Sequence, residues 1–340
     1  MHMTKKSKYL RRGLSALQRE LEQGPLADSR YFILVDENTL NCCLPVLIGT
    51  LSALENAEFI EVPVGEECKS IEVATQVWQT LMESGADRHT VLLCLGGGCV
   101  CDLGGFVAAT YMRGMPLVMV PTTLLAMVDA AIGGKCALNM NEVKNVVGTF
   151  YQPDVICIEP AFLHTLPDEE TLSGYMEMVK TAAVGSPELF HTLLTVETAE
   201  RRTINEVTKI KQKIVSLDPF DHGIRHILNF GHTFGHAVEM YSHLPHGIAV
   251  GVGMTLAMYL SVQKTGLDKE VYTTYKQWVG QKIALPHYSL RDAEAMLQLM
   301  HHDKKNQDGK LLCVLLKELG CVMIDVEVND NEVRDAFLRL

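Results

Sequence analysis

Short, almost continuous apolar runs alternate with a helical pattern in the first half of the chain. The strand candidates are 31-YFILVD-36, 58-EFIEVP-63, 91-VLLCL-95, 117-LVMV-120 and 155-VICI-158. Residues 71–86, after the second of them, repeat apolar side chains at helical spacing, namely Val73, Val77, Leu81 and Met82. Because strands that are covered on both faces are apolar throughout, this half predicts a mostly parallel sheet with helices on both of its faces.

The hydrophobic pattern changes after 163-LHTLPDEE-170. Pro167 suits the first turn of a helix, and the three acids after it suit the positive end of the helix dipole. The remainder predicts mostly helices, apart from two strand-like runs at 312–316 and 322–328. A chain of 340 residues is long enough for two domains. We therefore expect an α/β domain over residues 1–166 and a mainly α-helical domain over residues 167–340.

The composition supports a folded chain and argues against a nucleic-acid partner. Hydrophobic residues make up 47% of the chain, which is enough for a substantial core. The 41 acids outnumber the 30 bases, giving a formal net charge of −11, so no basic surface is expected for duplex binding. An anionic small molecule is still compatible, because a single pocket can gather Lys and Arg against the overall sign.

The cysteines and the longest apolar run indicate a cytoplasmic protein with no membrane partner. The ten cysteines include no C-x-x-C pair, so neither a disulfide framework nor a thiolate zinc site is expected. The basic N-terminus lacks the apolar segment of a signal peptide. The run 247-GIAVGVGMTLAMYLSV-262 is shorter than a membrane span and predicts a buried core helix.

A glycine-rich turn follows the third strand candidate, in 91-VLLCLGGGCVCDLGGFVAA-109. Glycines allow backbone N–H groups to approach a phosphate, and the N-terminus of the following helix would stabilise the anion by about 0.3–1 kcal/mol. Gly96 and Gly98 fit a dinucleotide-binding fingerprint, but Cys101 occupies the place of its third glycine, and a Walker lysine is missing. The turn alone leaves a dinucleotide site and a merely tight strand-to-helix turn equally open.

Polar residues interrupt the small and apolar ones in 121-PTTLLAMVDAAIGGKCALN-139. The hydroxyls of Thr122 and Thr123 could bond to phosphate or ribose, and a charge such as Asp129 is costly in apolar surroundings unless it is paired or functional. Taken singly, Asp129 is more simply a helix cap and Lys135 a solvated loop residue. The segment as a whole favours a site, because cations recur beside glycines and small residues at Arg113, Lys135 and Lys144.

Residues 228–254 hold four histidines in an apolar, glycine-rich setting. His232 and His236 are one helical turn apart, so both could face one cation, and His246 could fold back from a loop. Upstream, Glu177 has a plainer interpretation as a surface salt bridge with the lysine three residues on. One carboxylate and two imidazoles with an open position is the composition of a catalytic zinc site. The cluster therefore favours a metal or catalytic site over core histidines.

Taken together, these segments closely resemble the 3-dehydroquinate synthase family of sugar phosphate cyclases. The resemblance covers most of the chain in ordered blocks, namely 65-GEECKS-70, GGGCVCDLGGF, ATYMRG, PTTLLAMVDAAIGGK, FYQP, FLHTLP, GYMEMVK, LDPFDHGIRHILNFGHTFGHAVE, HGIAVG and 302-HDKKN-306. It implies a Rossmann-like N-terminal domain and a helical, metal-binding C-terminal domain. It also implies an active site between the two domains and a homodimer as the usual assembly.

The resemblance implies roles for individual residues, carried over by position. The metal, Zn²⁺ or Co²⁺, would be bound by Glu177, His232 and His246, whereas His236 would act on the substrate. The NAD-binding residues would be Asp36, Glu66, Lys69, Gly97, Gly98, Asp102, Thr122, Thr123, Phe162 and Thr165. The residues lining the substrate would be Arg113, Asp129, Lys135, Lys144, Asn145, Lys180, Lys211, Arg225, Asn229 and Lys305. The fourth histidine, His243, receives no role.

The sequence departs from the family's usual pattern at positions that are not proposed ligands. Cys101 and Gly104 stand where the family often has Gly and a small residue, Cys136–Ala137 replace a common Thr-Gly, and Pro219 replaces a frequent acid after Asp218. The last departure leaves open how the loop before Arg225 is held.

The implied substrate is 3-deoxy-D-arabino-heptulosonate 7-phosphate, whose carboxylate and phosphate would explain the cations. The implied reaction is oxidation of a hydroxyl by NAD, β-elimination of phosphate, return of the hydride, and ring opening with aldol closure to 3-dehydroquinate in the shikimate pathway. Because NAD is regenerated, such an enzyme is a carbon–oxygen lyase and not a net oxidoreductase. A metal would acidify the alcohol, as it lowers the pKa of bound water to about 7. Lys144, Lys211 and Lys305 are expected at the phosphate, with Asn145 and Lys180 nearer the carboxylate and hydroxyls.

Three other functions fit parts of the same pattern. A related cyclase could act on a different sugar phosphate, such as sedoheptulose 7-phosphate. A metal-dependent alcohol dehydrogenase of the glycerol dehydrogenase type would need no phosphate-binding cations and would accumulate NADH. A chain that binds NAD and metal without turnover is disfavoured, because every proposed ligand and charged contact is kept.

Overall fold

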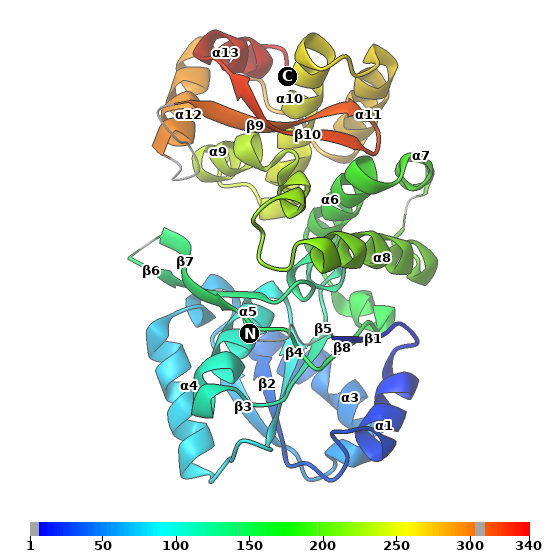
Figure 1. Cartoon of the computed structure of the whole chain (residues 1–340), viewed down its shortest axis with the longest axis vertical. Coiled ribbons are helices and arrows are strands. Elements are labelled where there is room, and N and C mark those ends of the chain that lie inside the picture. Colours follow the sequence, from blue (N-terminus) through cyan, green and yellow to red (C-terminus); the bar gives the residue numbers. More distant parts are fainter. Residues whose placement is uncertain (1–6, 142, 197, 303–309) are drawn as a thin grey trace. The chain divides into compact units, whose positions relative to one another are not determined.

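The computed structural model describes residues 7–141, 143–196, 198–302 and 310–340, and the chain forms two compact units, Met1–Pro167 and Asp168–Leu340 (Figure 1). This division lies one residue beyond the expected end of the first domain at 166. Within the described ranges, every helix is too short or too polar to cross a membrane. All ten cysteines lie in these ranges as free thiols.

Unit 1 is built on a six-stranded sheet in the order β1-β8-β5-β4-β2-β3, and every neighbouring pair is parallel. Its strands are β1 (Lys8–Leu10), β2 (Tyr31–Asp36), β3 (Glu58–Val62), β4 (Val91–Gly96), β5 (Leu117–Pro121) and β8 (Val155–Cys157). β2, β4 and β5 are buried along their whole length, as their unbroken apolar sequences predict. All five strand candidates are confirmed; the short β1 was not predicted.

Helices lie on either side of this sheet (Figure 1). They are α1 (Leu14–Gln23), α2 (Glu37–Cys42), α3 (Leu44–Thr50), α4 (Ile71–Glu83) and α5 (Gly98–Thr110), with short helical turns η1 (Ser52–Leu54), η2 (Gly65–Cys68), η3 (Tyr111–Arg113), η4 (Ala126–Ala130, a π-helix) and η5 (Pro160–Thr165). The predicted helix at 71–86 is α4; Ser70 caps its first turn by accepting from Val73 N.

A two-stranded antiparallel hairpin, β6 (Lys135–Met140) and β7 (Val143–Phe150), also belongs to unit 1. The sequence analysis treated this segment as a carrier of polar groups and did not predict strands. β6 buries only alternate residues, and β7 is exposed or half-buried along its length. The segment therefore lacks the continuous apolar run that marked the other strands.

Unit 2 is mainly helical, as expected. Its helices are α6 (Asp168–Gly185), α7 (Pro187–Thr195), α8 (Arg201–Leu217), the short turn η6 (Ile224–Asn229), α9 (His232–Ser242), α10 (His246–Lys264), α11 (Lys269–Lys282), α12 (Leu290–His302) and α13 (Asp330–Leu338). The strand-like pair forms an antiparallel hairpin, β9 (Leu311–Glu318) and β10 (Cys321–Val328). α10 contains the glycine-rich apolar run and is almost wholly buried, which confirms the predicted core helix.

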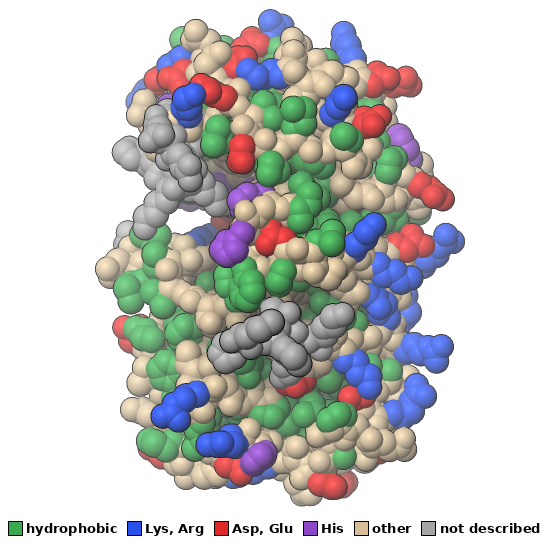
Figure 2. Space-filling model, in the orientation of Figure 1, with side chains coloured by type: hydrophobic (Ala, Val, Ile, Leu, Met, Phe, Trp, Pro, Cys, Tyr) green, Lys and Arg blue, Asp and Glu red, His purple; other side chains and the backbone are tan. Residues whose placement is uncertain are grey.

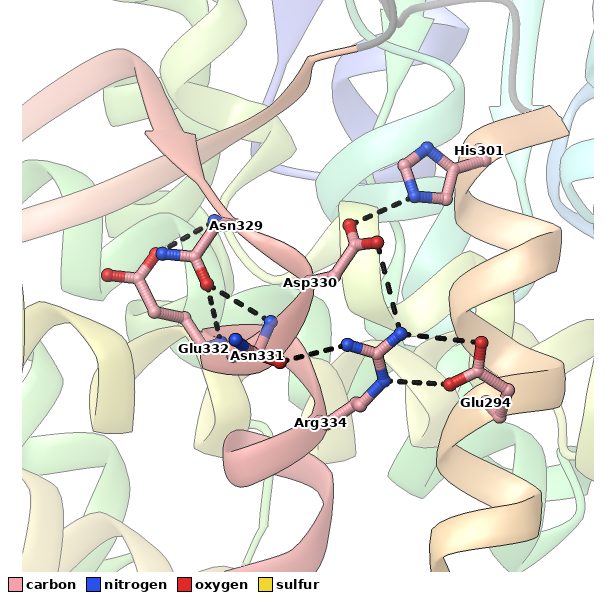
Figure 3. A network of polar contacts seen from close by, with 7 residues as sticks. All are labelled: Glu294, His301, Asn329, Asp330, Asn331, Glu332 and Arg334. Carbon is pink, nitrogen blue, oxygen red and sulfur yellow. Dashed lines mark hydrogen bonds and ion pairs between the residues drawn. The ribbon is translucent and has the colours of Figure 1, made fainter.

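A polar network ties α12 to the start of α13 (Figure 3). Arg334 donates to Glu294 from Nε (2.7 Å) and to Asn331 from Nη1 (3.1 Å). His301 Nε2, at the end of α12, lies 3.1 Å from Asp330 Oδ1. The network therefore links both ends of the segment that joins the two helices.

Candidate metal and cofactor sites

Three helices of unit 2 bring one carboxylate and two imidazoles together. α6 carries Glu177, while α9 and α10 begin at His232 and His246. The turn into His232 requires Gly231, whose φ is 79°, and a Cβ added there would lie 2.9 Å from the backbone N of Met254. The glycine therefore allows the start of α9 to lie directly against α10.

α10 approaches α6 just as closely. Gly247 N donates to Ser173 Oγ (3.0 Å), and a Cβ added at Gly247 would lie 2.0 Å from Ser173 O. Farther along α10, Gly253 faces the backbone of Gly231 and Gly235 on α9. These close approaches explain the glycines within the apolar run, and they fix the positions of the three segments.

The resulting cluster has the geometry of a metal site. Glu177 Oε1 lies 3.7 Å from Nε2 of His232 and 3.7 Å from Nε2 of His246. The Glu177 side chain is fully buried, and within the described residues neither of its oxygens has a partner in hydrogen-bond geometry, although Lys180 Nζ lies 2.5 Å from Oε2. One buried carboxylate oxygen that faces two imidazole nitrogens is a donor set that fits a divalent metal.

The other ring nitrogens of the two histidines have partners of their own. His246 Nδ1 lies 2.8 Å from Glu239 Oε2, and His232 Nδ1 lies 3.3 Å from Phe230 O. Both partners are acceptors, so they favour the proton on Nδ1 and the lone pair on Nε2, the nitrogen that faces Glu177. This carboxylate–histidine arrangement is typical of metal sites in proteins.

His236 lies beside this cluster but outside it. Its ring centroid is 5.5 Å from that of His232 and 5.9 Å from that of His246. Among the described residues, the group that could hold a metal consists of Glu177, His232 and His246. Helical spacing alone had allowed His232 and His236 to face one cation; the geometry instead pairs His232 with His246.

Three buried cations lie on α6 and on the elements packed against it in unit 2. Lys180 on α6, Lys211 on α8 and Arg225 on η6 have relative exposures of 2%, 5% and 4%. α6, α8 and η6 pack against one another. Lys180 pairs with Glu177, and Arg225 donates to Pro219 O, so these buried cations have protein partners and are also candidates for contacts with an anionic ligand.

The loop before Arg225 is held without the acid that Pro219 replaces. The Asp218 carboxylate accepts backbone N–H bonds from His222 (2.9 Å), Gly223 (2.7 Å) and Arg225 (3.1 Å). The bond from His222 is the main reason that the pKa of Asp218 falls to about 2. Arg225 Nη1 in turn donates to Pro219 O (3.0 Å), so the backbone of Pro219 still contributes to the loop.

In unit 1, five of the ten expected cofactor residues lie at the carboxyl ends of parallel strands or directly after them. β2 ends at Asp36, β4 leads into Gly97 and Gly98, and β5 is followed by Thr122 and Thr123. β5, β4 and β2 are neighbours in the sheet, so these ends share one edge, where ligands of open α/β sheets commonly bind. Gly97 caps α5 without a side chain, which leaves its helix terminus open to an anion.

Some of these side chains also have local structural roles. Asp36 Oδ1 caps α2 by accepting from Thr39 N (2.8 Å), and Thr123 Oγ1 accepts from Ala126 N (3.1 Å). Phe162 is buried in η5, where Thr165 Oγ1 lies 3.5 Å from its carbonyl oxygen. Cofactor binding by these residues stays a prediction.

Lys69, Asp102 and Asn145 form a polar group next to α5. Lys69 Nζ, on a side chain only 4% exposed, donates to Asp102 Oδ2 (2.7 Å) and to Asn145 Oδ1 (2.6 Å). Burial raises the pKa of Asp102 to about 6, although Lys69 opposes the shift. Burial acts to lower the pKa of Lys69, but the ion pair and hydrogen bond with Asp102, together with the nearby Glu66 carboxylate, raise this pKa overall. The expected cofactor residues Lys69 and Asp102 thus contact Asn145, which was expected at the substrate.

The other expected substrate residues of unit 1 lie on irregular or exposed backbone. Asp129 lies in the π-helix η4, a conformation that is frequent at functional sites. Arg113 has a φ of 65°, while Lys135 and Lys144 are exposed on the β6–β7 hairpin. In unit 2, Asn229 ends η6. Lys305 lies outside the described residues.

In unit 1, the residues that depart from the family's usual pattern pack against α5 or lie within it. Cys101 is buried, and its Sγ lies 3.8 Å from Gly96 O. A Cβ added at Gly104 would lie 2.1 Å from Cys94 Sγ, and one at Gly105 would lie 2.2 Å from Cys136 Sγ. These cysteines therefore fill space against the glycine face of α5.

Sequence reasoning missed Glu239 and Asn139. Glu239 follows His236 by three positions in the helix, so helical spacing places it on the same side of α9 as that histidine, and this signal could have identified it. Asn139 contacts Glu66, which is far away in sequence, and Asn145, which lies across the hairpin turn. No local pattern could have indicated the contact with Glu66.

Comparisons with known proteins agree with the fold and with the metal cluster. The family described as 3-dehydroquinate synthase N-terminal matches residues 59–173, and the one described as 3-dehydroquinate synthase C-terminal matches residues 174–306. A 3-dehydroquinate synthase from Bacillus mycoides is 39% identical over 339 residues, which is 96% of this chain and 93% of that protein.

Solved structures share the architecture over the whole chain. The 2-epi-5-epi-valiolone synthase from Streptomyces hygroscopicus, with NAD⁺ and Zn²⁺ bound, has a TM-score of 0.83 at 25% identity and covers 100% of this chain and 97% of its own. An iron-containing alcohol dehydrogenase from Thermococcus thioreducens shares the fold, with a TM-score of 0.66 at 17% identity over 98% of each chain. Because the two family matches span more than half of the sequence, the chain belongs to the 3-dehydroquinate synthase family.

Proposed function

We propose that the protein is a lyase that converts 3-deoxy-D-arabino-heptulosonate 7-phosphate to 3-dehydroquinate and phosphate. The observation that carries the proposal is the buried Glu177 carboxylate, which faces two imidazoles while buried cations lie on the elements around it. The substrate offers hydroxyls for a metal and two anionic groups for the cations. Family membership supports the same reaction.

Glu177, His232 and His246 would hold the divalent metal, Zn²⁺ or Co²⁺. When bound, such a metal would acidify the hydroxyl group of an alcohol and so favour oxidation of that alcohol to a ketone. Glu239 and the Phe230 carbonyl keep the two imidazoles oriented for ligation through Nε2. Zn²⁺ in the related valiolone synthase supports the choice of metal.

Residues next to the metal ligands would act on the substrate. Lys180 neutralises Glu177 at 2.5 Å, and its other N–H groups would bond to substrate hydroxyls or carboxylate. Lys211 and Arg225 would bind anionic oxygens, at roughly 1.5–3 kcal/mol for each charged hydrogen bond. His236 would orient the substrate or move a proton through a ring nitrogen.

Unit 1 would bind NAD at the carboxyl edge of its sheet. NAD would accept a hydride from the substrate and return it after phosphate has left, so that no net oxidation occurs. The N-terminus of α5 would bind the pyrophosphate through its backbone N–H groups. NAD⁺ in the valiolone synthase structure supports this cofactor.

We also propose a homodimer, which light scattering of the purified protein would test.

A measurement of phosphate release tests the proposed reaction. With Zn²⁺ and a catalytic amount of NAD, the protein is expected to release inorganic phosphate from the seven-carbon sugar acid phosphate without accumulating NADH, and a chelator is expected to stop it. His232→Ala is expected to abolish this turnover and leave NAD affinity nearly unchanged, whereas His287→Ala, at an exposed histidine of the same unit, retains both.

Three outcomes would contradict the proposal. Accumulating NADH without phosphate release would favour an alcohol dehydrogenase, which shares the fold. A preference for sedoheptulose 7-phosphate would favour another cyclase. Full turnover by the His232→Ala variant in chelator would refute the metal-ligand assignment.

A further inference from the structure

Asn139 connects two parts of unit 1 that are far apart in sequence. Its side-chain Nδ2 donates to Glu66 Oε2 (2.6 Å), and its Oδ1 accepts from Asn145 N (2.9 Å). Asn139 lies in β6 at an irregularity of the hairpin register between Leu138 and Met140. Such irregularities re-aim side chains and are frequent beside functional sites.

The hairpin residue Asn145 is held from two sides. Its φ is 56°, a left-handed conformation that a side chain adopts only at some cost. The Asn139 side chain binds its backbone N–H, and Lys69 Nζ binds its Oδ1 at 2.6 Å. The placement of Asn145, and of Lys144 next to it, therefore depends on the segment that contains Glu66 and Lys69.

The same contacts leave hydrogen-bonding capacity on Lys69 and Glu66. The Lys69 ammonium has three protons, and two of them go to Asp102 and Asn145. The Glu66 carboxylate accepts from Asn139 and lies 3.6 Å from Cys99 Sγ, so it keeps further acceptor positions. A dinucleotide could therefore bind to Glu66 and Lys69 while both remain bonded to the hairpin.

A purely structural role accounts poorly for the Asn139 side chain. The backbone already anchors the hairpin, because Asn139 N donates to Lys69 O at 2.7 Å. Glu66 and Asn145 are exposed, and hydrogen bonds in contact with water contribute little net stability. The side chain adds directional control over Asn145 more than it adds stability.

We propose that Asn139 is a positioning residue that couples dinucleotide binding at Glu66 and Lys69 to the placement of Lys144 and Asn145 for the anionic substrate. This inference rests on the proposed function of the two groups of residues. Coupling of this kind is reciprocal: each ligand strengthens the binding of the other by the same factor.

The test varies NAD and the sugar acid phosphate together on the zinc-loaded full chain, with phosphate release as the readout. In the wild type, the apparent KM for the sugar phosphate is expected to be about fivefold lower at saturating NAD than at low NAD. This factor is at the lower end of typical coupling. Asn139→Ala is expected to bring this factor close to one, mainly by raising KM and not by lowering kcat. Its backbone bond to Lys69 is retained, so a lost factor reports on the side chain.

Two further variants make the result decisive. Asn139→Asp keeps an acceptor for Asn145 N but replaces the donor to Glu66 with a repelling charge, so it should also lose the coupling, even if the alanine variant unfolds. Met140→Ala, at the exposed neighbouring position, should keep it. A wild-type factor of one, or an unchanged factor in the folded Asn139 variants, overturns the inference. A wild type that binds NAD but releases no phosphate instead refutes the proposed function, and the coupling proposal with it.

Discussion

Each imidazole of the candidate metal site uses its two ring nitrogens for different partners. In His246, Nε2 faces Glu177 while Nδ1 contacts the carboxylate of Glu239 at 2.8 Å. A charged acceptor at Nδ1 makes the opposite nitrogen more basic, so it should strengthen a bond from Nε2 to a metal. In His232, Nδ1 lies 3.3 Å from the Phe230 carbonyl oxygen, a neutral acceptor.

Removing the Glu239 carboxylate should therefore weaken metal binding. We expect Glu239→Ala to lower Zn²⁺ affinity by about 10–100-fold, the usual effect of losing an outer partner of a ligating histidine. Glu239→Gln keeps a neutral acceptor and should fall between that variant and the wild type. Competition with a chromophoric chelator measures the affinity directly. Met240→Ala, at the neighbouring residue that is 62% exposed, is the control. Equal affinities for Glu239→Ala and Met240→Ala would contradict the role of the carboxylate.

At this scale the sequence identified the chemistry but not the geometry. One carboxylate and several histidines indicated a metal site, yet helical spacing alone favoured His232 with His236. His246 meets His232 because two helices begin side by side, which no spacing along the chain encodes. The resemblance supplied that pairing. Helical spacing could have placed Glu239 beside His236, but its contact with His246 is visible only in the folded structure.

Glycines determine how closely the helices of unit 2 approach. On α10, Gly247 lies against α6, and Gly253 lies against the backbone of α9. The sequence analysis predicted a buried helix here because the run was apolar, but it gave no reason for the glycines. That reason is helix packing, since backbone atoms occupy the places where side chains would be.

A methyl group at Gly253 should force α9 and α10 apart. The added Cβ of Gly253→Ala would lie 2.1 Å from Gly231 O and 2.6 Å from Gly235 N, and these backbone atoms cannot move alone. We expect a loss of about 1–3 kcal/mol in the free energy of unfolding, together with weaker metal binding, because Gly231 precedes the ligand His232. Urea unfolding of the metal-free protein, followed by Trp278 fluorescence in a Trp78→Phe background, measures the first effect in unit 2.

The same substitution elsewhere provides the control. At Gly280 in α11 the atom nearest to an added Cβ is Leu285 Cδ1, at 3.7 Å. Gly280→Ala should therefore stabilise the helix by roughly 0.5–1 kcal/mol. If both alanine variants were equally stable, close helix packing would not be the reason for the glycine at position 253.

Element prediction from the sequence succeeded for the sheet of unit 1 and for the β9–β10 hairpin, and failed for the β6–β7 hairpin. β2, β4, β5 and β8 are buried throughout, and β3 was recognised although its burial alternates, whereas the β6–β7 hairpin mixes buried, half-buried and exposed residues. Its lysines and asparagines indicated candidate site residues, but the pattern did not predict strands. The Asn139 contacts that depend on this hairpin were therefore beyond sequence reasoning.

On the scale of the whole molecule, a net negative charge coexists with a few buried cations. The net charge is −11, and acidic and basic side chains are both spread over the face shown in Figure 2. The cations of the candidate sites, Lys69, Lys180, Lys211 and Arg225, are each no more than 5% exposed. The proposed anion binding would therefore rely on these buried cations and not on the overall charge, with which an anionic small molecule is compatible.

The proposed cofactor sites are also divided between the two units. Every residue expected to bind NAD lies in Met1–Pro167, and all three metal ligands lie in Asp168–Leu340. A ligand stabilises the structure that binds it by RT ln(1 + [L]/Kd), about 2.7 kcal/mol at a hundredfold excess over Kd. Adding Zn²⁺ should therefore slow amide hydrogen exchange in α6, α9 and α10, and adding NAD should slow it in η2 and α5. Amides that exchange only when the bound unit opens should slow by up to about a hundredfold. His232→Ala should lose the first effect and keep the second. Zinc-dependent protection confined to unit 1, or retained in full by His232→Ala, would show that the metal binds elsewhere.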